Sequence, residues 1–383
     1  MTEADQALKA RIRALAYEHG FALCHFTRPR IPAWHRAALQ RWLAQGFHGT
    51  MHWMADSERL QRRIHPHALL PGVRTVISLA MRHHPPAYTL SEALHAKGRG
   101  VIAAYAQGDD YHEVMKKRLK ALARALDALL GRHDQRVYVD TAPILEHALA
   151  ERAGLGWQGK HSLTIQRDIG SWFLLGELFT TAELPVDRAA SAHCGRCRAC
   201  LDVCPTGAIV APYVVDARRC IAYLTIEYKG MIPHALRPLI GRRVFGCDDC
   251  QHVCPWNRKV VPADEDLLGV RREHVLPDLA QLFLHDEEAF RARFRKSPVR
   301  RTGRAAMLRN VCIAMGNDGD PRWRTPLRKA LDDPSALVRA HAFWALTRLG
   351  GETKMLRAAV AREQDPEARR DMLRTLQEQK ETS

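Results

Sequence analysis

The chain has 383 residues, of which 46% are hydrophobic and 26% are charged, and its formal net charge is +16. This composition is ordinary for a globular protein of two or three domains and excludes a chain that is disordered overall. The longest apolar stretch, 169–179, is too short to cross a membrane, and the charged N-terminus lacks a signal-peptide pattern, so we expect a cytoplasmic protein.

The first informative elements in chain order lie near residue 140. Val137–Val139 is typical of a short buried strand, and Asp140 follows it directly. An Asp at such a position is commonly a helix N-cap. A carboxylate at the edge of a sheet, close to a glycine-rich loop, is also where α/β folds hold catalytic groups. Both interpretations of Asp140 stay open at this point.

A glycine-rich loop comes next. Residues 142–153 have apolar positions at helical spacing, and 161–165 is typical of a strand. The glycines between them satisfy G-x-G-x-x-G, but a dinucleotide site needs the strand before the loop and the helix after it. The reversed order argues against a Rossmann site. The glycines indicate close passage of the backbone, with Trp157 and Lys160 offering a flat face and a cation to a large ligand.

Eight of the ten cysteines lie between Cys194 and Cys254. Cytosolic thiols stay reduced, so metal or redox use is favoured over disulfides. The first set is spaced C-x2-C-x2-C-x3-C-P, and the last three cysteines end in the same C-x3-C-P. A zinc ribbon has no use for the third cysteine or for that ending. A cubane cluster takes three thiolates from one short loop and a fourth from the remote cysteine before proline.

We therefore predict two interlocked 4Fe–4S clusters. The ligands of the first are Cys194, Cys197, Cys200 and Cys254, and those of the second are Cys204, Cys220, Cys247 and Cys250. The remaining Cys24 and Cys312, each in an apolar segment that resembles a helix, are expected to be buried core thiols.

The last quarter of the chain is basic and helical. From Phe290 to Ser383 there are 21 Lys and Arg and 11 Asp and Glu, so +10 of the +16 lies there. Concentrated positive charge favours a nucleic-acid partner, although a solvated basic surface is the simpler explanation. Asp-Pro segments at Asp333 and Asp365, 32 residues apart, indicate a helical-hairpin repeat. Its apolar residues are expected in the core, among them Leu337, Phe343, Trp344 and Leu346.

Four long motifs carry a family resemblance: "VDTAPILEHALAERAGLGWQGKHSLTI", "GSWFLLGELFT", "CLDVCPTGAIVAPYVVDARRCIAYLTIEYKG" and "GCDDCQHVCPWNRK". With "RLQRRIHPHALLPGVRTVISLAMRHHP" and "YAQGDDYHEVMKKRLKAL", they resemble the epoxyqueuosine reductases, bacterial cobalamin-dependent enzymes of tRNA modification. The resemblance extends from about Arg59 to Leu349.

The resemblance implies a fold of three parts. These are an α/β (α+β) cobalamin-binding domain at 1–185, a two-cluster ferredoxin-like domain at 186–262, and an all-α HEAT-like repeat at 263–383. It also implies a monomer in which electrons from reduced ferredoxin or flavodoxin cross both clusters to base-off cobalamin. The epoxide of epoxyqueuosine at the tRNA wobble position would then be reduced to the alkene of queuosine, with a proton arriving as the C–O bond breaks.

The resemblance further implies roles for named residues. Asp140 is the expected proton donor, with a pKa raised by burial near the corrin. The expected cobalamin contacts are Arg63, Asp140, Trp157, Lys160, His161 and Thr164, with Cys247 and Asp248 at the cluster edge that faces the corrin. The expected contacts to tRNA phosphates are Arg295, Lys296, Arg300, Arg301 and Arg304.

The chain departs from the family pattern at several positions. His161 stands where asparagine is expected, Gln158 where an aliphatic residue is expected, and Gln107-Gly108-Asp109 where Arg-Gly-Arg is expected. The last change removes two positive charges from a loop that would otherwise be expected to contact RNA. Asp110-Tyr111-His112 does not continue into D-x-H-x-x-G, so it offers no lower histidine ligand to cobalt, in agreement with base-off binding.

Two alternatives remain. A corrinoid iron–sulfur reductase of a small molecule, similar to the reductive dehalogenases, is disfavoured by the basic repeat and the missing export signal. A non-catalytic ferredoxin-like carrier that binds nucleic acid would leave the block 139–165 without a purpose, and it would bind no corrin.

Overall fold

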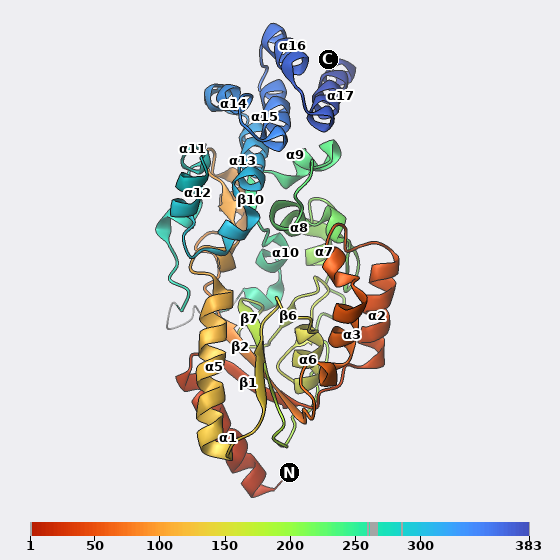
Figure 1. Cartoon of the computed structure of the whole chain (residues 1–383), viewed down its shortest axis with the longest axis vertical. Helices are drawn as coiled ribbons and strands as arrows, with labels where there is room; N and C mark the ends of the chain where they lie inside the picture. Colours follow the sequence, from red (N-terminus) through yellow and green to blue (C-terminus); the bar gives the residue numbers. More distant parts are fainter. Residues whose placement is uncertain (1, 259, 261–266, 285, 383) are drawn as a thin grey trace.

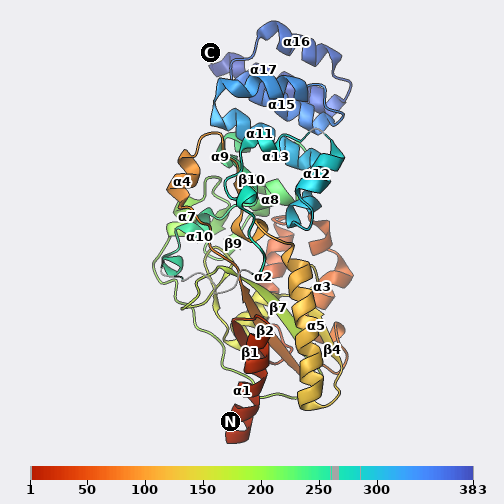
Figure 2. The same cartoon turned by 90° about the vertical axis from the view of Figure 1, so that its left-hand side faces the viewer.

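The computed structural model describes residues 2–258, 260, 267–284 and 286–382. The chain is elongated, with its two termini at opposite ends (Figure 1). The sheet and its helices lie towards the N-terminal end, and helices α13–α17 (residues 304–382) lie towards the C-terminal end (Figures 1 and 2). None of the helices in the described residues has the length and apolarity needed to cross a bilayer.

A four-stranded sheet organises the N-terminal half. Its order is β1 (Leu23–Thr27), β2 (Thr75–Arg82), β7 (Phe173–Thr180) and β4 (Gln135–Tyr138), and every neighbouring pair is antiparallel. This part of the protein is therefore of the α+β kind rather than a doubly wound parallel sheet.

Helices cover both faces of this sheet, which explains the almost unbroken apolar sequence of β2. Alternate residues of a strand point to opposite faces. Ile77, Leu79 and Met81 therefore pack against α1 (Glu3–Glu18) and α5 (Tyr111–Leu130). Val76 and Ala80 lie in the clusters that include α6 (Glu146–Ala153) on the other face. Helices α2 (Ala33–Ala44) and α3 (Ser57–Ile64) lie on the α6 side (Figure 1).

The helix and hairpin around the glycine-rich loop confirm the order predicted for them. Helix α6 ends at Gly154, whose φ of +79° suits glycine, and the hairpin β5 (Trp157–Gln158) and β6 (Thr164–Ile165) follows. A Cβ on Gly154 or on Gly156 would collide with a backbone carbonyl, of Arg188 and Ile165 respectively. The glycines therefore allow close passage of the backbone, and they do not form a dinucleotide site.

The cysteine-rich region lies between the sheet and the helical end. Its helices α7 (Ala199–Val203) and α10 (Asp249–His252) pack against each other. The other elements here are β3 (Val101–Ile102), β8 (Ile209–Ala211), β9 (Val214–Val215), β10 (Arg243–Phe245), α4 (Leu90–His95), α8 (Ile221–Ile226) and α9 (Arg237–Ile240). Strands β3 and β10 are parallel and join this region to the N-terminal half.

The C-terminal helices confirm the predicted repeat. They are α11 (Leu279–Leu282), α12 (Glu287–Arg293), α13 (Arg304–Asp318), α14 (Arg324–Ala330), α15 (Ala336–Arg348), α16 (Thr353–Arg362) and α17 (Pro366–Thr382). Asp365 directly precedes α17, and Asp333 lies three residues before α15. Phe343, Trp344 and Leu346 are buried and Leu337 is half-buried.

One apolar core runs from Ile102 through 217–245 to Met372, so the cysteine-rich region and the helical repeat share it. The expected domain boundary between 262 and 263 falls outside the described residues. Cys312 is buried in α13, as expected, and burial raises the pKa of its thiol. Cys24 is also buried, with a thiol pKa raised to about 12, but it lies in strand β1, so the helical prediction for it was wrong.

Candidate active site

A cavity of about 1080 Å³ opens beside the sheet, between α2, α3, α6 and the β8–β9 hairpin. Its lining combines several aromatic side chains with charged and polar ones. Its lining residues include Trp34, Trp42, Trp53, Arg63, Asp140, Glu146, His147 and Tyr213. Its volume is at the upper end of the range for small-molecule sites, so it can take a large cofactor.

Asp140 lies at this cavity, two residues after the end of edge strand β4. Its side chain is 42% exposed. The next helix, α6, begins only at Glu146 and has Leu145 as its N-cap. Asp140 therefore caps no helix, and of the two interpretations left open by the sequence the N-cap is wrong.

A hydrogen-bonded chain surrounds Asp140. His112 Nε2 lies 2.9 Å from Asp140 Oδ1, and the Tyr111 hydroxyl donates to Asp140 Oδ2. His112 Nδ1 lies 2.5 Å from Asp110 Oδ1, and Arg301 Nε donates to Asp110 Oδ2 at 3.0 Å. Tyr111 and His112 open helix α5, and Asp110 is its N-cap. The sequence singled out these three residues only as an incomplete cobalt-ligand motif.

The electrostatics of Asp140 differ from the expectation. Burial acts to raise the pKa of this carboxyl, but the hydrogen bonds and charge of His112, with the Tyr111 hydroxyl, outweigh it and lower the pKa below its usual value. The prediction of a raised pKa was wrong for this arrangement. Conversely, burial acts to lower the pKa of His112, but the carboxylates of Asp110 and Asp140 raise it.

Two further cavity residues were missed by sequence reasoning. Burial and the charge of Asp140 raise the pKa of Glu146 to about 7. Burial lowers the pKa of His147 to about 4, and its Nδ1 lies 2.7 Å from Thr164 Oγ1. Both residues open α6, a few positions after Asp140, and that proximity was the available signal.

Among the predicted cofactor contacts besides Asp140, Arg63 lines this cavity, whereas Thr164 and His161 are buried and are not among its lining residues. Arg63 lines the cavity, is buried, and holds its guanidinium 5.2 Å from the centre of the Trp53 ring. Thr164 is placed behind the cavity by its bond to His147. His161 is buried, its Nδ1 accepts from the amide of Leu163 at 3.2 Å, and its Nε2 has no partner among the described residues.

Two other predicted cofactor contacts, Lys160 and Trp157, lie against the cysteine-rich region instead. Lys160 Nζ donates to the carbonyls of Gly195 at 2.7 Å and Cys197 at 2.9 Å. Trp157 is buried beside Cys254 and meets Trp256 edge-to-face, with ring centres 5.0 Å apart. These side chains support the cysteine-rich region and do not line the cavity.

Cys247 and Asp248 lie deeper, next to the core shared with β3 and β10. Asp248 is buried and accepts from the amide of Ala104 at 2.7 Å, and burial raises the pKa of its carboxyl to about 6. Cys247 is half-buried and packs against the large C-terminal core. Cys197, by contrast, is exposed. One end of the cysteine-rich region therefore reaches the surface, and the other lies inside the molecule.

The predicted RNA-contacting residues divide into two groups. Arg295, Lys296 and Arg300 are exposed, and Arg301 is exposed but paired with Asp110. Arg304 is 9% exposed, and both of its terminal nitrogens donate to Asp333 at 2.8 Å. The prediction that Arg304 grips RNA was wrong, because its guanidinium joins the start of α13 to the turn before α15.

The departures at 107–109 have structural explanations. Gln107 is buried, and its amide donates to the carbonyl of Ile102 at 2.9 Å. Asp109 pairs with Arg271 at 2.5 Å. Both side chains bind within the protein, so neither replaces the expected arginines as a contact for RNA.

Three sequence families match parts of the chain. They are epoxyqueuosine reductase QueG, DUF1730, at 63–141, the 4Fe-4S double cluster binding domain at 193–257, and HEAT repeats at 300–377. The epoxyqueuosine reductase of Pseudomonas aeruginosa is 50% identical over 82% of this chain and 88% of its own. That of Xanthomonas campestris is 47% identical over 89% of this chain and 96% of its own.

Solved structures agree with these relatives. An epoxyqueuosine reductase crystallised with an epoxyqueuosine-modified tRNA-Tyr stem loop matches with a TM-score of 0.90 at 27% identity, over 98% of this chain and 99% of that one. The Bacillus subtilis enzyme, solved with its catalytic aspartate loop swung out of the active site, matches with a TM-score of 0.87 at 27% identity, over 97% and 99%. The chain therefore belongs to the epoxyqueuosine reductase family.

Proposed function

We propose that this protein reduces the epoxide of epoxyqueuosine, at the wobble position of tRNA, to the alkene of queuosine. The observation that carries the proposal is Asp140 at a large cavity, beside a double-cluster domain, in a fold that matches an enzyme crystallised with epoxyqueuosine-modified tRNA. The family match favours this function over reduction of a small molecule. Since tRNA is the proposed substrate, the enzyme is expected to act in the cytoplasm. The monomeric state is expected from the family resemblance.

The double-cluster domain supports iron–sulfur chemistry, and the surroundings of the thiols support our ligand assignment. Burial raises the pKa of Cys200 to about 11, and its neighbours Cys254, Cys194 and Cys197 add to the rise. Burial likewise raises the pKa of Cys250, with Cys220 as the largest neighbouring charge. These neighbours belong to the sets proposed for the first and second clusters.

The cavity fits a cobalamin cofactor. Its volume and the aromatic side chains in its lining suit a large ring system, and buried Arg63 offers its guanidinium to a bound ligand from the same lining. We propose Arg63 and His161 as contacts of such a group; Arg63 lines the cavity, as does Asp140, whereas His161 is not among the lining residues. When bound, cobalamin supplies a strongly reducing metal centre. Cys247 and Asp248 would lie at the edge of the second cluster facing it.

Electrons are proposed to enter at the first cluster. Of the eight thiols proposed as ligands, only Cys197 of this set is exposed; Cys200 and Cys254 of the same set are buried, and the four thiols of the second set are half-buried. Reduced ferredoxin or flavodoxin is the expected donor. Lys160 holds the first cysteine loop through two backbone carbonyls, and this contact positions the cluster that faces the donor.

The protein's own groups then handle the RNA and the proton. Arg295, Lys296 and Arg300 are placed to contact phosphates, which position the RNA without reading its sequence. The modified base has to leave its stack to reach the cavity. Asp140 gives a proton to the epoxide oxygen as the C–O bond breaks, because an unprotonated alkoxide is a poor leaving group.

The test is anaerobic. The clusters are reconstituted, cobalamin is added, and the enzyme is mixed with epoxyqueuosine-containing tRNA and a low-potential reductant. Nucleoside mass spectrometry then measures loss of one oxygen atom. Conversion that depends on cobalamin supports the proposal. No conversion by an enzyme whose clusters and cobalamin are bound and reducible contradicts it and favours a small-molecule substrate.

A further inference from the structure

His112 is held between two carboxylates. Its Nε2 lies 2.9 Å from Asp140 Oδ1 and its Nδ1 lies 2.5 Å from Asp110 Oδ1. A carboxylate only accepts hydrogen bonds, and a neutral imidazole has a single N–H. Each of the two bonds needs a proton, and a neutral histidine between two carboxylates supplies only one. The three groups together therefore hold one additional proton. A dissociable proton lies within one hydrogen bond of Asp140.

The groups around the imidazole decide whether His112, Asp110 or Asp140 holds this proton. The Tyr111 ring stacks on His112 with centres 4.0 Å apart, and its hydroxyl donates to Asp140. Glu146 and His147 of α6 act on Asp140 from the cavity side, and Arg301 pairs with Asp110. Asp140 is thus stabilised as an anion by two donors, and the two carboxylates raise the pKa of His112. The proton rests on the imidazole.

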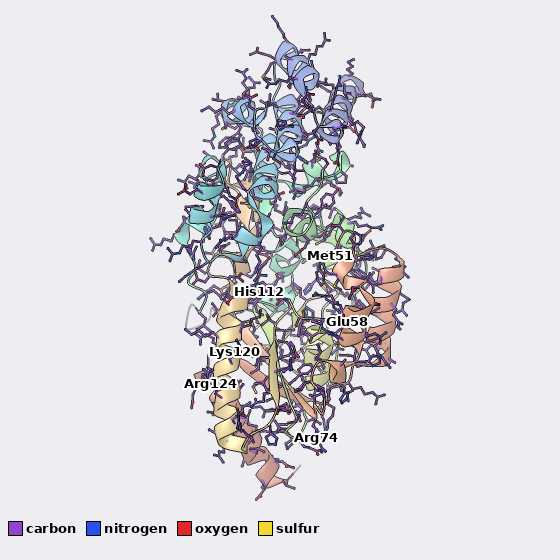
Figure 3. All side chains as sticks on the ribbon, in the orientation of Figure 1. Met51, Glu58, Arg74, His112, Lys120 and Arg124 are labelled. Atoms are coloured by element: carbon purple, nitrogen blue, oxygen red, sulfur yellow. The ribbon has the colours of Figure 1, made fainter. Side chains whose placement is uncertain are left out.

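The position of His112 suits it to donate a proton to Asp140. It lies at the N-terminal end of α5, at mid-height of the molecule, where the sheet half meets the cysteine-rich region (Figure 3). Its side chain is 8% exposed, so bulk water does not compete strongly for its hydrogen bonds. Asp110 is fixed on two sides, by Arg301 and by donation of its own amide to the carbonyl of Lys296 at 2.6 Å. Asp110 therefore fixes the ring of His112.

We propose that His112 is a positioning residue that supplies, through its Nε2 hydrogen bond, the proton that Asp140 delivers to the epoxide oxygen. This rests on the proposed function. Asp140, an anion at rest, takes the Nε2 proton of His112 and passes it to the epoxide oxygen as the first C–O bond breaks. A second proton reaches the oxygen by the same route, once His112 has been reprotonated, as the second C–O bond breaks and the oxygen leaves as water. Neutral His112 is reprotonated from solvent. Overall, two electrons from the low-potential reductant and two protons convert the epoxide to the alkene and water.

The first experiment follows the single-turnover rate of the cluster- and cobalamin-loaded enzyme against pH. For the wild type, the rate should fall as pH rises through the pKa of His112, which lies above 6.5. Asp110→Asn removes one carboxylate and should move this fall to lower pH by about one unit. His112→Gln should abolish the fall and slow the reaction roughly 10- to 100-fold. His133→Gln, at an exposed histidine, is the matched control and should behave like the wild type.

Glu146 needs its own variant because its pKa of about 7 lies in the same pH range. Under the proposal, Glu146→Gln retains the fall at the pKa of His112. If Glu146→Gln abolishes that fall while His112→Gln retains it at wild-type rate, Glu146 supplies the proton and the proposal is overturned. Cluster content, cobalamin binding and circular dichroism establish that each variant is folded and loaded.

A second readout does not depend on activity. Histidine NMR of the enzyme without substrate, assigned with His112→Gln, measures the pKa of this imidazole directly. A value above 6.5 that falls in Asp110→Asn supports the proposal, and a value below 6.5 overturns it. If the wild type reduces no epoxyqueuosine, the proposed function has failed. If it does, and His112→Gln has the wild-type pH profile, only the inference about His112 has failed.

Discussion

Arg301 Nε lies 3.0 Å from Asp110 Oδ2, and this ion pair joins the short helix Pro298–Thr302 to the N-cap of α5. The other oxygen of Asp110 holds His112, which is bonded to Asp140. The basic segment proposed to contact RNA is therefore connected through hydrogen bonds to the proposed proton donor. Under these proposals, RNA placement and proton delivery would share Asp110 as a supporting residue.

Asp140→Ala should retain both clusters and cobalamin but lose most turnover, by roughly 10²- to 10⁴-fold, because no other carboxyl occupies its position. Iron content and the cobalamin spectrum measure cofactor loading, and nucleoside mass spectrometry measures the rate. Full activity in a loaded Asp140→Ala enzyme would show that the proton comes from elsewhere.

Replacing Arg295, Lys296 and Arg300 together by Gln should weaken tRNA binding and flatten its salt dependence. Each phosphate contact contributes about 0.7–0.9 to the slope of log K against log salt. The matched control neutralises three exposed cations, Lys120, Arg124 and Arg132; the first two lie on α5, away from this segment (Figure 3). Binding is measured by fluorescence anisotropy at several salt concentrations. Equal slopes in the two triple variants would place the RNA site elsewhere.

Arg304→Met should destabilise the helical repeat without weakening RNA binding. It leaves the carboxylate of Asp333 buried without its bidentate partner, which costs about 3–5 kcal/mol for a buried pair. Urea unfolding followed by circular dichroism measures the free energy of unfolding. The double variant Arg304→Met, Asp333→Asn should recover part of the loss. A tRNA affinity that falls at a temperature where the variant is folded would contradict the structural role.

Asp371 provides a pH-dependent contribution to stability. It pairs with Arg237 and His234, and although burial acts to raise the pKa of this carboxyl, these partners lower it from 3.8 to about 2. A lowered carboxyl pKa stabilises the folded state above the unfolded pKa, and the contribution is lost as pH falls through the folded value. About 2 kcal/mol is therefore present above pH 5 and lost between about pH 4 and pH 2.

The difference in free energy of unfolding between wild type and Asp371→Asn should accordingly shrink as the pH is lowered from 5 to 2. Chemical denaturation at a series of pH values measures it. The matched control is Asp168→Asn, at an exposed carboxyl for which no ion pair is seen among the described residues. If the free energies of unfolding of the wild type and Asp371→Asn differ by the same amount at every pH, the Asp371 carboxylate makes no pH-dependent contribution to stability.

The double-cluster region, the helical repeat and the position of Asp140 after a strand could be predicted from the sequence alone. Cubane ligands come from one short loop with a fixed spacing, and the two repeat helices carry their own apolar periodicity and Asp-Pro starts. These are properties of neighbouring residues, so no long-range packing is needed to recognise them. Family resemblance added the chemistry that these motifs serve.

Only the tertiary structure decided which groups meet across long stretches of chain. His112 and Asp140 are 28 positions apart, and their hydrogen bond reverses the expected direction of the Asp140 pKa shift. Arg304 is buried against Asp333, and Lys160 reaches the first cysteine loop instead of the cavity. Charge and pKa depend on burial and on partners within about 3 Å, and these are set by packing between distant elements rather than by local sequence.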